Sequence, residues 1–509
     1  MKAHGSGGEE VAKGQGESES RFEGRFTIPT PKGVYQAAGD ANVNPEYAYR
    51  AVNIRTQRGL LATSFGTSRA FPALGAPIET LERFYRRSRP EDPEVFVAGA
   101  GGAIYTYTMG TEGWIRRAEG FAGDRWSCVT YEMNTQEKTV DILIMSNAQD
   151  GMIVIYGDDL RVERKKLEIG EDRGPVRFAQ LNRYAERIWG TGAPGYPDDI
   201  FYSRAYDPFD WTSEPDTPEM GGGVIKQPTW DGDAFMGFAP FGAFLLAIKG
   251  RTIFEIRGSD PSNFMVTQTY GSDGPVQART LCTDRLQMLF LTQRGLGLYD
   301  GAKMEILSRD ALYETMRMRM EGMERAATAC MCGHVYYLAL CVKEHDGDVL
   351  TQNNTVIEYD TQRGTFMIRK GIRVRDFFVT DGQVYFTQAD MPYEVLRYSD
   401  EKSGSYLGEP MKCLWETPWL DLGKELTKRD FVLRFTADAD ENGVPLQLAI
   451  ITDRKEKTKT VLLSRMRRDY RVKIQASGAR VRLRIESGER AAGWRIYGGI
   501  QAQYGMDEE

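Results

Sequence analysis

Paired apolar runs recur along this chain at a spacing of 44 to 56 residues. Each pair consists of a strand-like run, a short break and a second run, as in FLLAIKGRTIFEI or MLFLTQRGLGLYD. A unit of short strands repeated at this period is typical of a β-propeller, in which four-stranded blades surround a channel. The sequence therefore predicts an all-β chain with a seven-bladed β-propeller-like domain. The seven units begin at Val95, Ile142, Ile188, Phe244, Met288, Val335 and Val384.

The segments before the first unit differ from one another. Residues 1–24 are rich in Gly, Ser and Glu, and we expect a flexible tail there. Residues 25–94 contain extended pieces such as GLLATSFGTSRAF. A terminal strand often completes the last blade of a propeller and so removes an open sheet edge. We therefore predict a propeller over residues 25–405, with N-terminal strands closing the last blade.

From residue 406 to the end, short alternating runs are separated by turn signals about every 8–12 residues. ARVRLRIE alternates strictly, so that Val481, Leu483 and Ile485 point one way and the intervening arginines point the other. This is the pattern of an antiparallel strand with one face in water. Seven such runs predict a C-terminal antiparallel β-sandwich over residues 406–509.

One segment inside the propeller region has helical periodicity. Asp310 is a suitable N-cap, and Leu312, Met316, Met320 and Met323 follow at helical spacing. One interpretation is a short helix packed against the propeller. The other is an adaptable, methionine-rich contact with a neighbouring subunit, through Met316 and Met320.

The third unit contains the most distinctive string, IFYSRAYDPFDW from Ile200 to Trp211. We expect a strand, a turn and an aromatic plug, in which Phe209 and Trp211 wedge between blades or cover one propeller face. Tyr206, Phe209 and Trp211 are therefore candidate interaction residues. The spacing of 56 residues also indicates an insertion that could reach a neighbour or the channel.

Charge adds one local feature to this picture. The 509 residues carry a formal net charge of −7, which argues against a general nucleic-acid binder. Positive charge nevertheless concentrates near the C-terminus, where it forms either a solvated sheet face or a surface for an acidic protein or a DNA backbone. The candidate residues are Arg465, Arg467, Arg468 and Arg482. No run of 18 apolar residues occurs, so we predict no membrane span.

The sequence contains no coherent set of catalytic residues. Its three histidines, His4, His334 and His345, fall in the tail and in predicted turns, which leaves few bases for nucleophilic catalysis. No carboxylate pair is singled out by its spacing. We predict that the protein is not an enzyme and has no catalytic or cofactor-binding residue.

Two motifs imitate metal sites. The string from Asp438 to Gly443 begins like a calcium loop, but position 12 is Ala449, and Asn-Gly between strands favours a hairpin. Cys330 and Cys332 lie closer together than zinc ligands usually do, and Gly333-His334 favours a hairpin turn. We predict no metal site and six reduced cysteines, as in a protein made in a cytosol.

Four segments resemble those of a known family, and the resemblance covers the chain from Ala51 to Tyr504. They are SFGTSRAFPAL, DDIFYSRAYDPFDW, FLLAIKGRTIFEIRGSDPSNFMV and WETPWLDLGKELTKRDFVLRF. The chain is similar in these segments to the packaged-DNA stabilisation or tail nozzle proteins of short-tailed phages, which are head-to-tail connectors. None of the four is a catalytic motif.

The resemblance implies a virion structural protein that is made in the host cytoplasm and located in the tail. Its copies would form a ring, expected to be a hexamer, that extends the portal–adaptor channel and retains DNA until ejection. The implied partners are a tail adaptor protein, a fibre, needle or tip protein, and passing double-stranded DNA without sequence specificity.

Two alternatives to this function come from different classes. A tail-tip adsorption module would bind cell-surface glycan or protein through propeller faces and exposed aromatic side chains. A polysaccharide hydrolase or lyase would place convergent carboxylates in the central channel.

Overall fold

The computed structural model describes most of the chain. The described residues are 24–37, 44–57, 59–134, 138–167, 169, 176–271, 273–399, 403–420, 422 and 427–507. The expected N-terminal tail, apart from Gly24, lies outside them. No helix in the described part is both long and apolar enough to span a bilayer.

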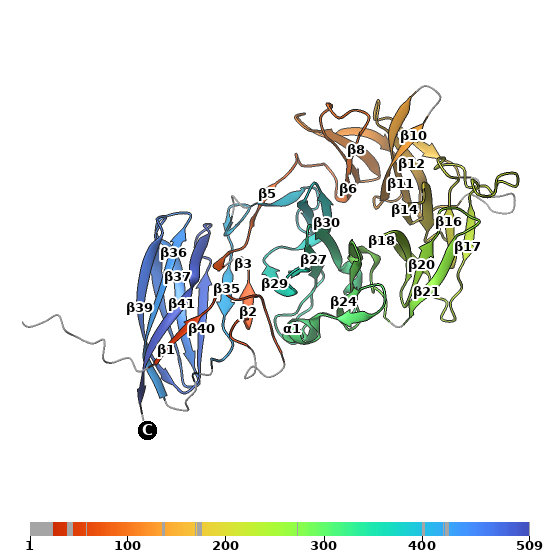
Figure 1. Cartoon of the computed structure of the whole chain (residues 1–509). Helices are drawn as coiled ribbons and strands as arrows, with labels where there is room; N and C mark the ends of the chain where they lie inside the picture. Colours follow the sequence, from red (N-terminus) through yellow and green to blue (C-terminus); the bar gives the residue numbers. More distant parts are fainter. Residues whose placement is uncertain are drawn as a thin grey trace, which may run out of the picture.

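Seven four-stranded antiparallel blades form a β-propeller (Figure 1); five are separate sheets, and two are parts of larger sheets. Blade 1 consists of β6 (Ile78–Phe84), β7 (Val95–Ala100), β8 (Ala103–Thr108) and β9 (Ile115–Glu119), and blade 2 of β10 (Ser127–Asn134), β11 (Thr139–Asn147), β12 (Gly151–Tyr156) and β13 (Val162–Lys165). Blade 3 consists of β14 (Gln180–Tyr184), β15 (Arg187–Thr191), β16 (Asp199–Tyr202) and β17 (Gly223–Lys226), and blade 4 of β18 (Phe235–Phe241), β19 (Phe244–Lys249), β20 (Thr252–Arg257) and β21 (Met265–Gly271). Blade 5 consists of β22 (Cys282–Asp284), β23 (Gln287–Thr292), β24 (Gly295–Tyr299) and β25 (Met304–Ile306), and blade 6 of β26 (Thr328–Cys332), β27 (Val335–Leu340), β28 (Thr355–Asp360) and β29 (Thr365–Lys370). Blade 7 consists of β30 (Val374–Thr380), β31 (Gln383–Gln388), β32 (Leu396–Ser399) and β5 (Gly66–Arg69). The predicted propeller is confirmed.

The seven apolar pairs of the sequence are the second and third strands of each blade. These middle strands pack against neighbouring blades on both faces, so they are apolar throughout; every residue of β7 and of β12 is buried. The clusters between neighbouring blades, such as that of blades 1 and 2 around Val97 and Leu143, hold the disc together by burying this surface. First and fourth strands are more polar, because one side faces the channel or the rim.

The ring is closed by a strand from the N-terminal region. β5 pairs with β32, with Thr67 opposite Tyr398, and so supplies the outer strand of blade 7. The first strands of the blades line the channel, and β30 of blade 7 contacts β6 of blade 1. β6 and β10 approach each other less closely than the other neighbouring first strands. Two short strands, β33 (Ser405–Tyr406) and β34 (Glu409–Pro410), extend blade 7.

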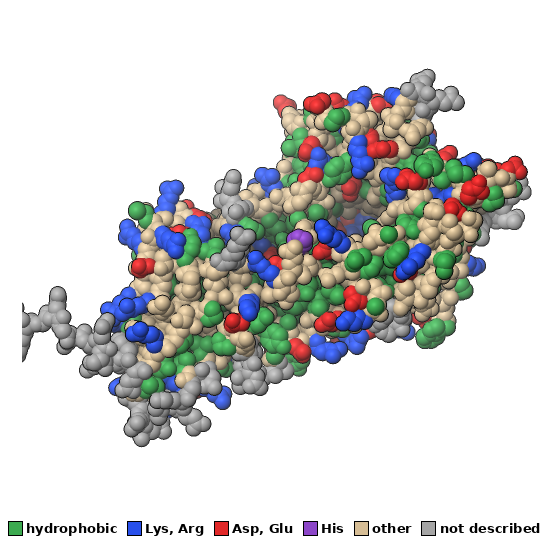
Figure 2. All heavy atoms as spheres, viewed as in Figure 1, with side chains coloured by type: hydrophobic (Ala, Val, Ile, Leu, Met, Phe, Trp, Pro, Cys, Tyr) green, Lys and Arg blue, Asp and Glu red, His purple; other side chains and the backbone are tan. Residues whose placement is uncertain are grey.

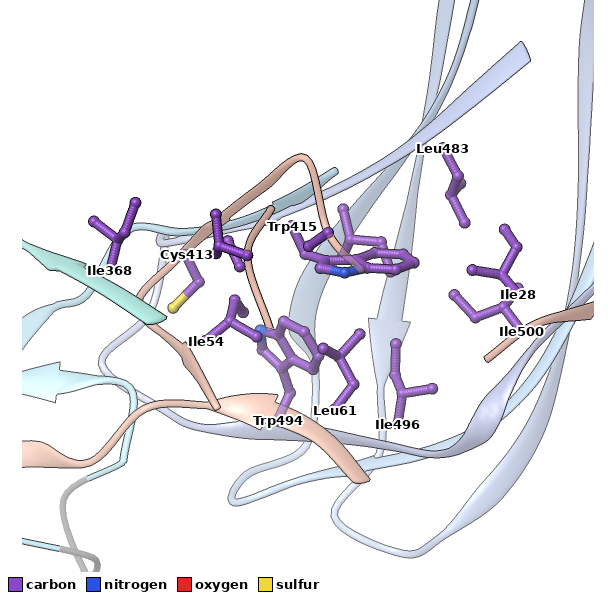
Figure 3. Close-up of a cluster of buried hydrophobic side chains, with 14 of the residues drawn as sticks. Ile28, Ile54, Leu61, Ile368, Cys413, Trp415, Leu483, Trp494, Ile496 and Ile500 are labelled. Carbon is purple, nitrogen blue, oxygen red and sulfur yellow. The ribbon is translucent and has the colours of Figure 1, made fainter. Parts of the chain in front are cut away.

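The remaining strands form a β-sandwich. One sheet has the order β3-β4-β41-β36-β39, with β1 beside β41, and the other has the order β2-β35-β40-β37-β38. Their bounds are β1 (Gly24–Ile28), β2 (Arg50–Val52), β3 (Ile54–Gln57), β4 (Leu60–Thr63), β35 (Cys413–Glu416), β36 (Thr427–Ala439), β37 (Val444–Thr452), β38 (Glu456–Leu463), β39 (Arg468–Gly478), β40 (Val481–Ser487) and β41 (Trp494–Asp507). Trp415, Trp494 and Ile496 fill the space between the sheets (Figure 3).

The two domains share one continuous sheet. β2 pairs with β29 of blade 6 on one side and with β35 of the sandwich on the other, which gives a nine-stranded sheet. The predicted propeller span of residues 25–405 therefore needs a correction at its N-terminal end, because β1 to β4 belong to the sandwich sheets and only β5 belongs to a blade. β3 pairs with the neighbouring β4, but β1, β2 and β4 pair with segments more than 300 residues away, which no local pattern reveals.

Asn53 fixes the junction at the end of β2. Its φ of 57° lies in the left-handed region, which Asn tolerates better than most residues. The side-chain amide donates to the carbonyls of Lys370 (3.0 Å) and Lys412 (2.7 Å), one from each domain. Its oxygen accepts from the Lys370 N–H (3.0 Å) and the Tyr406 hydroxyl (2.9 Å). A single buried side chain thus ties propeller and sandwich together.

The predicted helix is shorter than expected. It consists of two brief turns, α1 (Ser308–Ala311) and α2 (Tyr313–Arg317). Beyond Arg317 the backbone pairs with the end of blade 6: Met320 N–H donates to the Cys341 carbonyl, and Lys343 N–H to that of Met318. This tertiary pairing ends the helix before Met320. Two 3₁₀ turns, η2 (Ala278–Thr280) and η3 (Glu324–Ala326), complete the helical elements described.

Of the two predicted hairpin turns, one is a hairpin. Gly333-His334 joins the paired strands β26 and β27, with Cys330 opposite Tyr337, as expected. Asn442-Gly443 lies between β36 and β37, which belong to opposite sheets. The Asn-Gly turn therefore crosses between the layers of the sandwich and does not form a hairpin.

Candidate functional site

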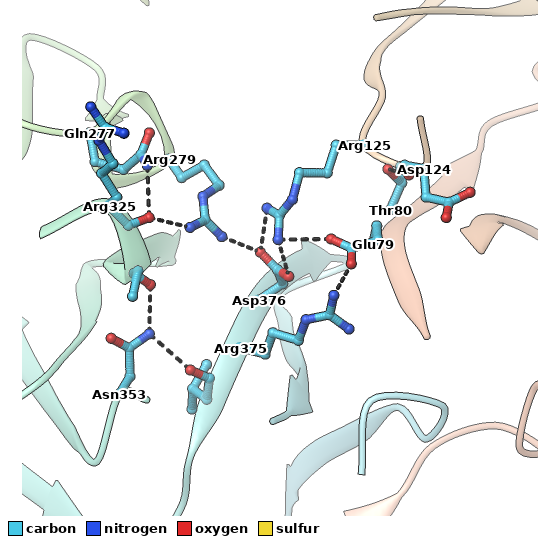
Figure 4. A network of polar contacts seen from close by, with 12 residues as sticks. Glu79, Thr80, Asp124, Arg125, Gln277, Arg279, Arg325, Asn353, Arg375 and Asp376 are labelled. Atoms are coloured by element: carbon cyan, nitrogen blue, oxygen red, sulfur yellow. Dashed lines mark hydrogen bonds and ion pairs between the residues drawn. The ribbon is translucent and has the colours of Figure 1, made fainter. Parts of the chain in front are cut away.

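The propeller channel holds the most elaborate polar cluster of the described residues. A cavity of about 790 Å³ opens at the channel, where Figure 2 shows the propeller hollowed. The lining side chains come from the first strands of the blades and from the turns that precede them. Charged side chains from four separate stretches of the sequence meet here. Figure 4 shows Glu79, Arg125, Arg279, Arg375 and Asp376, and Glu82 also lines the cavity.

Asp376 is the centre of this cluster. Its two carboxylate oxygens accept from both terminal nitrogens of Arg125, at 2.9 Å each, which is the bidentate geometry that suits a guanidinium. Oδ1 also accepts from Arg279 Nη1 at 2.6 Å. The Asp376 side chain is nearly inaccessible, so these bonds are weakly screened. Arg125 precedes blade 2 and Arg279 precedes blade 5, whereas Asp376 lies in blade 7.

Two β-bulges aim a second ion pair into the channel. The pairing of β6 with β7 skips Glu79, and the pairing of β30 with β31 skips Arg375. A bulged residue leaves the strand pairing and can redirect its side chain. Glu79 and Arg375, from adjacent blades, form an ion pair, and Glu79 also binds Arg125 at 2.8 Å. The bulges therefore connect blades 1, 2 and 7 around the channel.

Glu82 is the channel carboxyl group without a hydrogen-bond partner among the described residues. Burial raises its pKa to about 7, so part of the population is protonated near neutral pH. Cys128, across the gap between β6 and β10, lines the same cavity, and burial and the Glu82 charge raise the pKa of its thiol. A neutral thiol is a poor nucleophile, so the chemistry available here is proton exchange by Glu82.

The geometry of the channel cluster favours a role in joining the blades through ion pairs over a role in catalysis. A glycosidase needs one carboxylic acid and one free carboxylate beside the substrate. Here Glu79 and Asp376 are occupied by guanidinium groups, Asp124 accepts from the Gly102 N–H, and Glu82 has no hydrogen-bond partner among the described residues. The network joins blades 1, 2, 5 and 7, so its most direct consequence is a rigid channel wall.

A second charged feature lies on the outer face of the sandwich sheet that contains β36 and β39. Four side chains of this face are exposed cations: Arg25, Arg434, Arg471 and Lys473. We call these four residues the basic sheet face. Arg434 lies directly opposite Arg471 on the neighbouring strand, an arrangement that destabilises a sheet. The described residues place no carboxylate within ion-pair distance of any of the four.

The predicted arginines of the C-terminal domain have different surroundings. Arg465, Arg467 and Arg468 are exposed in and beside the β38–β39 turn, and the Arg467 guanidinium lies 3.9 Å from the Tyr497 ring centroid. Arg482 was expected in water, and this prediction is wrong, since it is only 7% exposed. It pairs with Glu416 at 2.6 Å and lies beneath the rings of Tyr49 and Trp419, which cover this side of β40.

The three aromatic candidates of the third unit are separated by their burial. Trp211 is 1% exposed, with its ring 4.7 Å from that of Phe178, so it belongs to the core between blades 2 and 3. Phe209 packs at the margin of that core under the Lys165 ammonium. Tyr206 is 63% exposed and has a left-handed φ of 63°. Only Tyr206 of the three presents a large free surface.

The two methionine candidates are both partly buried. Met316 packs against the large hydrophobic cluster shared by blades 5 and 6 and the sandwich. The Met320 sulfur accepts a hydrogen bond from the Leu350 N–H. These contacts fit the interpretation in which the segment packs against its own propeller.

One exposed residue was not singled out in the sequence. Trp230, in the turn between β17 and β18, is 93% exposed. The base of this turn is held by the buried Lys249 ammonium, which donates to Asp198 (2.6 Å), the Gln227 carbonyl (2.9 Å) and the Thr229 hydroxyl (3.3 Å). A tryptophan on an ordered turn is a typical anchor for a partner. Its neighbours Pro228 and Gly232 indicate only a turn, so no pattern in the sequence distinguishes Trp230 from other turn residues.

The metal-like motifs form no cluster. Within the described ranges no group of three His, Cys, Asp or Glu side chains could hold an ion, and the six cysteines are free thiols. Burial raises the pKa of Cys330 well above its usual value, which favours the neutral thiol and disfavours metal binding.

Comparisons with known proteins bear on the fold alone. No protein-family model matches the chain, and no curated protein matches it in sequence. The extracellular domain of BT4673 from B. thetaiotaomicron is 10% identical (TM-score 0.30), with 75% of this chain and 53% of that chain covered, so the chain spans about half of that structure. The Neurospora crassa Pan2 WD40 domain is 11% identical, with a TM-score of 0.34 and with 66% of this chain and 95% of that chain covered. A chain of a mitotic checkpoint complex is 10% identical, with a TM-score of 0.35 and with 65% of this chain and 96% of that chain covered. The class of the protein, a seven-bladed β-propeller joined to a β-sandwich, follows from its own sheets.

Proposed function

We propose that this chain is a ring-forming structural subunit of a phage tail nozzle. The ring extends the channel below the portal and its adaptor, and keeps packaged double-stranded DNA inside the virion. The neighbours in this proposal are further copies of the chain, the adaptor, and a fibre, needle or tip protein. DNA passes without sequence-specific contacts.

The nine-stranded sheet shared by propeller and sandwich is the observation that carries this proposal. Domains joined only by a linker are expected to move relative to each other. Here β2 is hydrogen-bonded to both domains, and Asn53 locks its end, so the chain behaves as one rigid body. A wall that confines DNA under pressure needs such a body. The ion pairs between blades stiffen the propeller further.

The proposal is tested on particles. Mass spectrometry of purified virions from cells that carry this gene should detect the chain in several copies. Imaging of the purified protein or of the tails should show rings with a central opening. A stable monomer that is absent from virions would refute the proposal.

An adsorption module is the second candidate, and Trp230 is the observation that favours it. An exposed indole on a fixed turn can stack on a sugar ring. The isolated protein would then bind to a glycan array or to whole cells, and Trp230→Ala would abolish that binding. A channel subunit binds neither, so the same assay separates the two functions.

A further inference from the structure

The basic sheet face is a cluster of four exposed cations that have no counter-ion among the described residues. The sheet register brings its cations together: Arg434 is opposite Arg471, Val432 is opposite Lys473, and Gln503 of β41 lies between Val432 and Arg25. The surrounding side chains are polar, and none of the large exposed apolar residues of the described chain lies on these strands' outer face. Charge, more than apolar burial, must therefore select the partner.

An acidic loop lies at the opposite end of the molecule. Residues 204–221, between β16 and β17, contain five acidic residues and one arginine. Asp207, Asp216 and Glu219 are exposed, together with the Tyr206 ring. Asp210 and Glu214 are engaged by Arg204, at 3.5 and 2.9 Å. We call residues 204–221 the acidic loop.

The acidic loop is held in place by a buried arginine. Arg187 in β15 is 1% exposed, and its guanidinium donates to the carbonyls of Ser203, Glu219, Met220 and Gly221. Burying a cation without a carboxylate is costly, and burial lowers the pKa of Arg187. The hydrogen bonds from Arg187 order the loop before it meets a partner, which reduces the conformational entropy lost on binding.

Three observations favour a second copy as the occupant of the basic sheet face. The charges are complementary: residues 406–509 carry 19 Lys and Arg against 16 Asp and Glu, whereas residues 1–405 carry 46 against 56. The sandwich and blade 3 lie at opposite ends of the molecule in Figure 1, so one chain cannot bring the two surfaces together. In Figure 2 acidic side chains gather at the far end of the propeller, and basic ones dominate over the sandwich.

We propose that the acidic loop of one copy docks on the basic sheet face of the next. Asp216 and Glu219 pair with Arg434 and Arg471, and Tyr206 supplies an aromatic face for a guanidinium. The contact joins two different patches, so it is heterologous, and repetition builds a ring where the rotation closes. This inference rests on the proposed function as a ring-forming subunit and names the contact that forms the ring.

Charge reversal on the full-length protein tests the contact. Two double variants, R434E/R471E and D216K/E219K, are compared with the quadruple variant that carries both changes. Sedimentation velocity over a concentration series measures assembly. Each double variant should raise the apparent dissociation constant at least about tenfold, and the quadruple variant should recover most of the loss. Added salt should weaken the wild-type contact.

Matched controls carry the same charge changes elsewhere. K457E/K459E alters exposed lysines on β38, the edge of the other sheet, and E112K/E321K alters exposed acids far from the loop. Both should assemble like the wild type. Thermal unfolding of every variant shows whether the fold is retained.

Three results would overturn the inference. The first is that the quadruple variant assembles no better than the double variant with the larger defect. The second is that the wild type remains a monomer throughout the series. The third is that R434E/R471E leaves assembly intact and abolishes binding to duplex DNA, which would assign the face to DNA. In the first and third cases the rings persist, so the proposed function survives without this contact. In the second case, the proposed function fails together with this inference if the chain is also absent from virions.

Discussion

The arginines of the channel and those of the sandwich surface show how the same side chain serves two purposes. Arg125, Arg279 and Arg375 each lie against a carboxylate from another blade. Arg434 and Arg471 face each other without a counter-ion among the described residues. The first group gains stability by closing the propeller. The two arginines of the second group repel each other in the monomer, and we propose that an anionic surface of a neighbouring copy covers them.

Removing the central carboxylate of the channel should have the largest effect on stability. Asp376→Ala leaves Arg125 and Arg279 without their shared partner, and we expect a loss of about 2–4 kcal/mol, reduced somewhat by the exposure of Arg125. Thermal unfolding followed by circular dichroism measures the loss. Asp346→Ala, at an exposed loop position, is the control. Equal unfolding temperatures for the two variants would show that the network contributes nothing.

Arg482 on β40 and Arg480 just before that strand provide the next prediction. Arg482→Ala removes the partner of the buried Glu416 carboxylate, and we expect a loss of about 2–3 kcal/mol. Arg480→Ala, two residues earlier and exposed, should change stability by less than about 0.5 kcal/mol. Chemical denaturation of both variants gives the difference. If Arg480→Ala proves as damaging as Arg482→Ala, the burial assigned to Arg482 is wrong.

Glu82 should make the stability of the channel dependent on pH. Because its pKa in the folded protein is about 7, above the ordinary value of 4.5, the unfolded chain ionises first as the pH rises. The folded state is therefore penalised progressively between about pH 4.5 and 7, and fully above pH 7. Glu82→Gln should raise stability by about 1–2 kcal/mol at pH 8 and leave it unchanged at pH 4. Thermal melts across this range measure the change; a constant difference at all pH values would contradict it.

The smallest expected effect is a gain in stability. Arg434→Thr removes one of two like charges that lie opposite each other, so the monomer should become more stable by about 0.2–1 kcal/mol. Differential scanning calorimetry at low salt resolves such a shift. The gain should shrink as salt is added, because salt already screens the repulsion. A loss of stability would mean that Arg434 has a stabilising contact.

The sequence predicted those elements whose partners lie nearby. The paired apolar runs are the middle strands of blades, which are apolar on both faces wherever they pack. The seven C-terminal runs correspond to β35 to β41, which pair mainly with one another. By contrast, β1 to β4 are three to five residues long, and their role depends on strands at the other end of the chain.

The polar sites were harder to predict for a related reason. Glu79, Arg125, Arg279 and Asp376 have no common spacing, because the ring closure alone brings them together. The alternation around Arg480 and Arg482 is the same for both residues, and only Trp419 and Tyr49 from other segments decide which one is buried. Trp211 wedges between blades 2 and 3, which is one of the two arrangements expected for it, and Tyr206 is exposed, while its role as an interaction residue stays a prediction.

The pairing of β5 with β32 has a consequence during synthesis. The two strands are separated by about 330 residues, so β5 leaves the ribosome long before its partner exists. At 5–20 residues per second the delay is roughly 15 to 65 seconds. β1 waits longer still, because β41 is the last strand translated. Nascent chains therefore carry an unpaired edge at β5 until β32 has been synthesised and has left the ribosome.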